Sequence, residues 1–129
     1  MADKIVLVDT SILIDLFRKT DKANSTLIYL VRQGYTYTIS AITEYEIYTG
    51  ATLGQVDFWN SFLERIEVLP FDKAVAKVAV DINQQLKRKR KLIETADLFI
   101  AATTIANNLP FATLNTKHFD RIDGLTIIK

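Results

Sequence analysis

Three acidic residues lie at positions where a folded chain could use them for chemistry. Asp9 directly follows the apolar run 5–8, and two hydroxyl-bearing residues come immediately after it. A carboxylate at the end of a buried strand needs a partner, and a metal ion is a common one. Glu46 lies in a segment with apolar residues at helical spacing, and Asp97 begins a nearly continuous apolar stretch. All three acids are therefore attached to apolar elements, which favours a shared site.

The chemistry that such acids support depends on which other ligands the chain offers. Carboxylates crowded together repel one another unless a cation lies among them. Oxygen ligands favour hard ions such as Mg²⁺ or Mn²⁺, which activate water for phosphodiester hydrolysis. The chain has no cysteine and one histidine, His118, which excludes thiolate sites and multi-histidine zinc sites. If the protein is an enzyme, carboxylates must therefore do most of the work.

Each acid also has a purely structural interpretation. Asp9 would cap the helix that follows it. Glu46 lies three residues after Thr43, which is the spacing of a capping box, and Asp97 would complement the dipole in the first turn of a helix. For each acid taken singly, both interpretations stay open. A rival chemistry, phosphoryl transfer through an aspartyl phosphate at Asp9, is disfavoured because Ser11 stands where HAD-type phosphatases carry a second acid.

Composition limits the class of protein. The chain has 129 residues, of which 49% are hydrophobic and 24% charged, as expected for a single domain over residues 1–129. The net charge of +1 gives no overall basic surface, so nucleic-acid binding must rest on local patches or on metal. The first residues lack the layout of a signal peptide, and no apolar run approaches the roughly 20 residues of a membrane helix. We therefore expect a cytoplasmic protein that does not contact a membrane.

The apolar pattern alternates between strands and helices. It predicts strands at residues 5–8, 35–39, 67–69, 111–114 and 125–128. It predicts helices at residues 11–17, 21–32, 40–50 and 59–66, a long helix after Asp72 that reaches residue 86, and a helix at 95–106. Strands separated by helices predict an α/β fold with a parallel sheet between helical layers. Ligands of such folds bind beyond the carboxyl ends of the strands, where Asp9 is expected.

Four short motifs occur in a characteristic order. They are Val8-Asp9-Thr10-Ser11, then Ile39-Ser40-x-x-Thr43-x-x-Glu46-x-x-x-Gly50, then Asp97-Leu98-Phe99-Ile100-Ala101-Ala102-Thr103, and finally Ala112-Thr113-Leu114-Asn115-Thr116-Lys117-His118-Phe119. In this order and spacing they resemble the PIN-domain family, and within it the VapC-type toxin ribonucleases of type II toxin–antitoxin systems. The resemblance covers essentially the whole chain. It implies a PIN-like three-layer α/β/α fold with a short central parallel sheet.

The resemblance also implies a function. Its members are Mg²⁺- or Mn²⁺-dependent endoribonucleases that hydrolyse phosphodiester bonds of RNA with a metal-activated water. Asp9, Glu46 and Asp97 match the metal-binding acids of the family, so we expect them to be both catalytic residues and metal ligands. The positions expected to support them are Thr10, Ser11, Thr113 and Asn115. The resemblance further implies a homodimer and a cognate antitoxin protein as a partner.

The last motif departs from the family pattern. Many relatives carry a fourth acid where Asn115 or His118 stands, and neither position is acidic here. The Asn115 amide oxygen can still bind a metal or orient a water, whereas a turn with left-handed backbone geometry is the alternative. A non-catalytic surface role is favoured for His118. The missing charge should weaken metal binding, and it keeps open a PIN domain that binds nucleic acid or a protein without cleavage.

A run of five consecutive cations lies shortly before the third acid. The residues expected to bind RNA are Lys87, Arg88, Lys89, Arg90, Lys91 and Arg18, with Lys19 as a further candidate. Such contacts give affinity and salt dependence rather than sequence choice. The alternative for the run is a solvated helix C-terminus that interacts favourably with the helix dipole.

Aromatic residues cluster in the middle of the chain. Phe58, Trp59 and Phe62 share one helical face, which favours core or partner contacts over base stacking. We hypothesise that Tyr45, Tyr48, Phe58 and Trp59 form apolar surface for the antitoxin.

Overall fold

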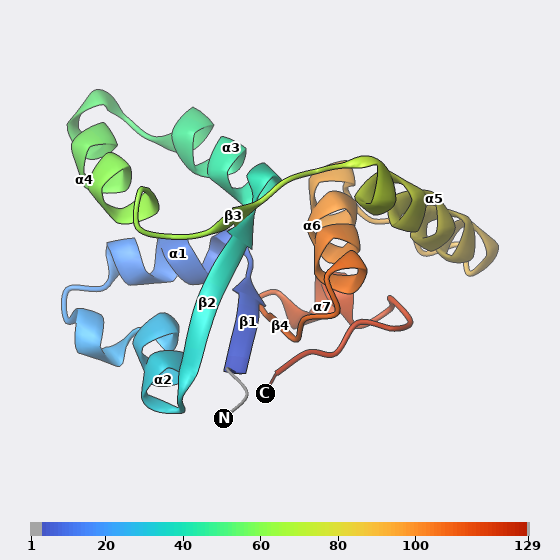
Figure 1. Cartoon of the computed structure of the whole chain (residues 1–129), viewed down its shortest axis with the longest axis horizontal. Coiled ribbons are helices and arrows are strands. Elements are labelled where there is room, and N and C mark those ends of the chain that lie inside the picture. The colour runs from blue at the N-terminus through green and yellow to red at the C-terminus, as the bar shows by residue number, and fades with distance from the viewer. Residues whose placement is uncertain (1–3, 129) are drawn as a thin grey trace.

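A parallel four-stranded sheet carries the fold, with helices packed against both of its faces (Figure 1). The computed structural model describes residues 4–128. The strands are β1 (Lys4–Val8), β2 (Tyr35–Ser40), β3 (Val68–Leu69) and β4 (Phe111–Ala112), in the order β3-β2-β1-β4. The central strand β1 pairs with β2 through Leu7 and Thr38, and with β4 through Val8 and Ala112. The predicted α/β fold class is confirmed.

The helices follow the strands in the expected alternation. They are α1 (Thr10–Arg18), the 3₁₀ helix η1 (Lys22–Asn24), α2 (Thr26–Arg32), α3 (Ala41–Gly50), α4 (Leu53–Leu63), α5 (Lys73–Arg88), α6 (Thr95–Ala106) and α7 (Thr116–Phe119). Side chains cap several of their amino ends, as Asp72 does by accepting a hydrogen bond from the Val75 amide at 3.0 Å. Within the described part of the chain, no helix combines the length and apolar character needed to cross a bilayer.

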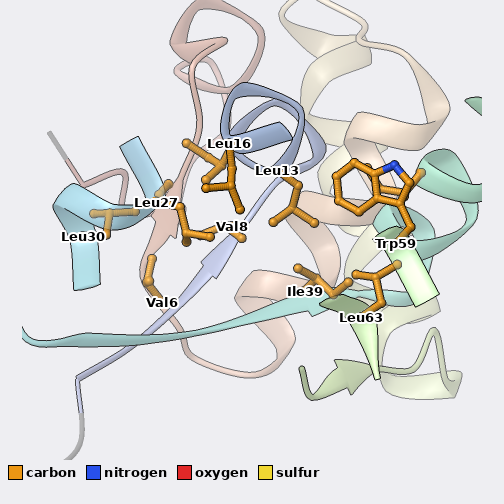
Figure 2. Packing of buried hydrophobic residues seen from close by; sticks show 12 residues of the cluster. Val6, Val8, Leu13, Leu16, Leu27, Leu30, Ile39, Trp59 and Leu63 are labelled. Atoms are coloured by element: carbon orange, nitrogen blue, oxygen red, sulfur yellow. The ribbon is translucent and has the colours of Figure 1, made fainter. Parts of the chain in front are cut away.

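Two apolar clusters fix the helices to the sheet. Strand β1 alternates, so that Val6 and Val8 belong to one cluster and Leu7 to the other. The first cluster joins β1 and β2 to α1, α2 and α4, and Figure 2 shows Trp59 among its aliphatic members. The second joins β1 and β4 to α5, α6 and α7 through Phe111 and Phe119. Both faces of β1 are thus covered, which explains its continuous apolar sequence.

Several predicted elements differ in the structure. The helix expected at 21–32 is divided into η1 and α2, because the buried Ser25 caps α2 by accepting from the Ile28 amide at 3.4 Å. The strand expected at 125–128 is reduced to one bridge between Phe111 and Ile127. Its partner β4 is itself two residues long instead of the expected four, so residues 125–128 have only a short strand to pair with.

The helix predicted at 59–66 is displaced toward the amino terminus. Helix α4 begins at Leu53 because Thr52 and Gln55 form a capping box, and it ends at Leu63. The Thr52–Gln55 pair has the sequence spacing of such a box, but the prediction rested on the apolar stripe of 59–66 and did not use it.

Candidate active site

The three acids line one cavity at the carboxyl ends of the strands. Asp9 directly follows β1, Glu46 lies in α3 after β2, and Asp97 lies in the first turn of α6, which leads into β4. The cavity has a volume of about 660 Å³. Parallel strands place their carboxyl ends on one edge, so residues that follow different strands meet there. The sheet therefore brings together acids that are far apart in the sequence.

Asp9 is the most buried of the three, with 3% of its surface exposed. Its Oδ1 accepts hydrogen bonds from the Ser11 amide, at 3.0 Å, and from the Ser11 hydroxyl. Its Oδ2 accepts from the Thr113 hydroxyl at 2.7 Å. Asp9 is also the N-cap of α1, so its structural interpretation is correct and does not exclude a role in the cavity. The predicted supporting positions Ser11 and Thr113 both fix this carboxylate.

Glu46 is held by the first residue of α1. The Thr10 hydroxyl donates to Glu46 Oε1 at 2.6 Å and lies 3.2 Å from the Thr43 hydroxyl. The N-cap of α3 is Ser40, whose hydroxyl accepts from the Thr43 amide at 3.1 Å. The capping-box interpretation of Thr43 and Glu46 is therefore wrong. The Glu46 carboxylate instead binds Thr10 at the cavity.

Asp97 faces the histidine of the last motif. His118 Nδ1 lies 3.4 Å from Asp97 Oδ2, and the Asp97 side chain is 23% exposed. Asp97 also occupies the first turn of α6, where its charge complements the helix dipole as its structural interpretation required. The imidazole of His118 thus borders one of the three acids of the site.

Burial controls the ionisation of two of the acids. It raises the pKa of the Asp9 carboxyl above its ordinary value of 3.8, although hydrogen bonds from Ser11 and Thr113 act in the opposite direction. Burial likewise raises the pKa of Asp97, and the neighbouring His118 partly offsets this effect. Both carboxylates would thus gain from a nearby cation that stabilises their ionised forms.

Cations and one further acid border the same cavity. Arg18 and Lys19, at the end of α1, line it, as does Asn115. Asn115 has φ −107°, so its alternative as a left-handed turn residue is wrong. Asp15 also lines the cavity and was not predicted. Its position four residues after Ser11, one helical turn further along α1, was the available signal.

The five-cation run lies at the end of α5 and is absent from the lining of the acid cavity. Lys87 and Arg88 form the last turn of α5, as the helix-dipole alternative describes. Lys89 forms an ion pair with Asp123 at 2.9 Å. Of the residues predicted to bind RNA, the structure brings Arg18 and the further candidate Lys19 to the lining of this cavity, and none of the five-cation run.

The aromatic residues divide between core and surface. Trp59 is 2% exposed and packs edge-on against Phe58 and Phe62, which confirms the core interpretation. Its suggested contribution to an antitoxin surface is wrong because almost none of it is accessible. Tyr45 is 68% exposed and Tyr48 is 38% exposed, so these two remain available for a partner.

The donor set around the cavity fits a hard divalent cation. Four carboxylates, those of Asp9, Asp15, Glu46 and Asp97, and the Asn115 amide offer oxygen ligands of the kind that Mg²⁺ and Mn²⁺ prefer. Within residues 4–128, no three carboxylate or imidazole side chains converge closely enough to form a ready-made metal cluster. The acids are instead engaged with hydroxyls and with His118. The role of Asp9, Glu46 and Asp97 as metal ligands stays a prediction.

Comparison with known proteins agrees with this architecture. The PIN domain matches residues 6–125, which is nearly the whole chain. The chain therefore belongs to the PIN-domain family.

Its relatives within this family are VapC proteins, as the four motifs predicted. The chain is 38% identical over 118 residues to Ribonuclease VapC1 of Methanocaldococcus jannaschii, an alignment covering 91% of this chain and 80% of that protein. It is 33% identical over 92 residues to the tRNA(fMet)-specific endonuclease VapC of Shigella flexneri, covering 67% of this chain and 70% of that one. The crystal structure of VapBC2 from Rickettsia felis, bound to a DNA fragment from the promoter, matches with a TM-score of 0.84. That match has 26% identity and covers 96% of this chain and 97% of the other.

Proposed function

We propose that this protein is a metal-dependent endoribonuclease and the toxin of a toxin–antitoxin pair. The observation that carries the proposal is the cavity in which Asp9, Glu46 and Asp97 meet at the carboxyl edge of the sheet. The names of two VapC relatives, a ribonuclease and a tRNA-specific endonuclease, support RNA as the substrate. A site with one exposed histidine and several carboxylates would best catalyse phosphodiester hydrolysis by binding a divalent ion.

The side chains divide the work according to their surroundings. Asp9 and Asp97, with Glu46, would hold Mg²⁺ or Mn²⁺, which lowers the pKa of a water molecule and stabilises charge on the leaving oxygen. The hydroxyls of Ser11 and Thr113 orient the Asp9 carboxylate by donating to its two oxygens. Because these donors favour the ionised form, they keep the buried carboxylate competent to bind a cation.

Other residues position the remaining parts of the site. Thr10 fixes Glu46 by a short hydrogen bond, so that α1 and α3 hold a constant separation at the cavity. Arg18 and Lys19 border the cavity and supply the positive charge that attracts an RNA phosphate. Asn115 offers a neutral oxygen that can bind the ion or orient a water.

We also propose two protein partners. A cognate antitoxin is supported by the similarity to a VapBC2 complex. The exposed Tyr45 and Tyr48 lie in α3 beside Glu46, so an antitoxin segment that contacts them would lie close to the acids. A homodimer is the expected assembly of the toxin, and its test is the mass of the purified protein in solution.

The test of the enzymatic proposal is cleavage of a labelled total-RNA pool by the purified protein. Reactions would contain Mg²⁺, Mn²⁺ or EDTA, with Asp97→Asn as the site variant and the exposed Asp81→Asn in α5 as the matched control. We expect cutting with either ion, none with EDTA, none with Asp97→Asn, and full activity with Asp81→Asn. Cutting that survives in Asp97→Asn or in EDTA would contradict the proposal.

A second candidate is a domain that binds nucleic acid without cutting it. Two observations favour it: the acids do not form a ready-made cluster within the described residues, and neither Asn115 nor His118 is acidic. Mn²⁺ affinity separates the candidates. A site without catalytic metal binding should hold Mn²⁺ no better than the Asp97→Asn variant does, whereas the nuclease should bind it more tightly.

A further inference from the structure

A second cavity adjoins Asp97. It has a volume of about 210 Å³ and is lined by Leu92, Ile93, Glu94, Asp97, His118 and Arg121. Asp97 lines this cavity and the acid cavity, so the two meet at a residue of the proposed nuclease site. A strand of RNA with its scissile phosphate in the acid cavity would therefore pass directly into the second one.

Helix α7 borders both cavities. Asn115, at its amino end, lines the acid cavity, and His118, three residues later, lines the second cavity. Residues three apart lie on one face of a helix. The same face of this short helix thus follows the path from one cavity to the next. The contact between His118 and Asp97 at 3.4 Å holds the imidazole at the boundary.

Arg121 supplies the fixed positive charge of the second cavity. Its Nη1 donates to the Lys91 carbonyl at 3.5 Å and its Nη2 to the Lys117 carbonyl at 3.3 Å. The ion pairs formed among residues 4–128 do not include Arg121. A guanidinium has five N–H donors, so donors remain for a phosphate after these two contacts. Backbone carbonyls thus position the guanidinium, which forms no ion pair with a carboxylate among the described residues.

The apolar part of the lining suits the base or ribose of a nucleotide. Leu92 is 56% exposed and Ile93 is half-buried, and both lie in the segment between α5 and α6. An exposed leucine beside an unpaired arginine offers a surface for a base or ribose next to a phosphate contact. Glu94 is the one lining carboxylate besides Asp97, and it opposes the charge of Arg121.

We propose that the second cavity binds the nucleotide next to the scissile phosphate of single-stranded RNA. Arg121 and His118 contact its phosphate, and Leu92 packs against its base or ribose. The inference rests on the proposed nuclease function. It also gives the five-cation run a place, because Arg121 binds the carbonyl of Lys91, the last residue of that run. The end of the run at Lys91 therefore contacts a lining residue of the second cavity, and the run would continue the basic path away from Asp97.

Binding without cleavage tests this inference. The protein would carry Asp9→Asn and be kept in EDTA, and the probe is a fluorescent mixed-sequence RNA of about 12 nucleotides, a length typical of single-strand sites. In this background Arg121→Gln is compared with Arg65→Gln, an exposed arginine between α4 and β3 near the opposite edge of the sheet. Leu92→Ala is the second variant, since its exposed side chain can be shortened with little effect on folding. Thermal unfolding of each variant verifies the fold.

We expect Arg121→Gln and Leu92→Ala to weaken binding of this RNA severalfold, and more than Arg65→Gln does. Loss of one phosphate contact should lower the salt slope for Arg121→Gln by about 0.7, the value for single strands. A dinucleotide has a single phosphate, which would occupy the acid cavity, so it should bind Arg121→Gln and its parent alike. Equal effects of Arg121→Gln and Arg65→Gln, or no binding of the mixed-sequence RNA at all, would overturn the inference.

Cleavage by the protein with Asp9 intact separates this inference from the proposed function. If it cuts RNA and Arg121→Gln changes neither binding nor KM, the second cavity has no role and the nuclease stands. If it does not cut RNA but binding depends on Arg121, the nuclease function fails and the second cavity stands as a binding site.

Discussion

Thr10 and Glu46 are joined by a hydrogen bond of 2.6 Å, which connects the first residue of α1 to the middle of α3. The two residues follow neighbouring strands, so this bond sets the spacing between two sides of the acid cavity. It also orients the Glu46 carboxylate, because the Thr10 hydroxyl donates to Glu46 Oε1.

Thr10→Val should therefore disturb the acid cavity while the protein still folds. The methyl group that replaces the hydroxyl leaves Glu46 without its donor, and we expect a loss of about 1 kcal/mol in the free energy of unfolding. We also expect a clear loss of RNA cleavage. Thr10→Ser retains the hydroxyl and serves as the matched control. Urea denaturation and single-turnover cleavage would measure the two effects, and equal cleavage by the Val and Ser variants would contradict the proposed role of Thr10.

Asp9→Asn should remove the free-energy cost of burying an ionised carboxylate, a cost that depends on pH. Because burial raises the pKa of Asp9 above 3.8, the folded state retains a proton in a pH range where the unfolded chain has lost it. The stability contributed by neutral Asp9 is therefore complete below 3.8 and is lost as pH rises through the raised folded pKa. In EDTA at neutral pH we expect Asp9→Asn to be the more stable protein, by about 1.4 kcal/mol for each unit of the shift.

Urea denaturation at a series of pH values in EDTA would measure this difference. The exposed Asp81→Asn variant is the control and should follow the unmodified protein at every pH. An Asp9→Asn protein that is less stable at neutral pH would show that the hydrogen bonds to Asp9, rather than its burial, dominate. The capping function of Asp9 would then be its main contribution.

Asn115→Asp should strengthen metal binding. Asn115 lines the acid cavity, so the change adds a carboxylate to the acids that already line it. We expect Mn²⁺ affinity to rise about tenfold, or about 1.4 kcal/mol in binding free energy. Isothermal titration calorimetry would measure it, with Gln84→Glu as a control that adds the same charge on the exposed surface of α5. An unchanged affinity would place the ion away from Asn115.

Arg90→Gly should stabilise the protein. Arg90 has φ 55°, a left-handed conformation that favours glycine, at the end of α5. The Lys91 amide donates to the Leu86 carbonyl at 2.9 Å and the Arg90 amide to the Lys87 carbonyl at 3.0 Å, which is the Schellman arrangement. Glycine relieves the backbone strain of the folded state but also raises the conformational entropy of the unfolded chain. We therefore expect the free energy of unfolding to rise by up to about 1 kcal/mol.

Arg90→Ala is the matched variant, because it removes the charge and keeps the Cβ atom. We expect Arg90→Ala to leave stability nearly unchanged, while both variants weaken RNA binding equally. Denaturation curves and the anisotropy of labelled RNA would measure these effects. If Arg90→Ala stabilised as much as Arg90→Gly, charge repulsion within the run would be the cause.

The sequence predicted the order of strands and helices because the relevant signals are local. The apolar run of β1 and the cap at Asp72 each act within a few residues. The division of 21–32 was missed because a serine inside an apolar pattern can lie within a helix or cap one, and the choice at Ser25 depends on its burial. The bridge at Ile127 likewise depends on the length of β4, which no local pattern reports.

The sequence predicted the acids of the site and the supporting residues of Asp9, but it missed the contacts of the other two acids. Asp9, Glu46 and Asp97 were recognised from their motifs, and the cavity confirms that they lie together. The partners of Glu46 and Asp97 were not predicted, because Thr10 and His118 reach them across the fold. Asp15 could have been found from helical spacing alone.

The hydrogen bond between Thr113 and Asp9 joins residues that are 104 positions apart. Asp9 leaves the ribosome early, while Thr113 and its strand β4 leave it almost a full chain length later. A nascent polypeptide that stops before β4 therefore holds the first acid without the hydroxyl and the strand that fix it. For a nuclease that attacks RNA, this order of synthesis delays the working site until translation of that segment is complete.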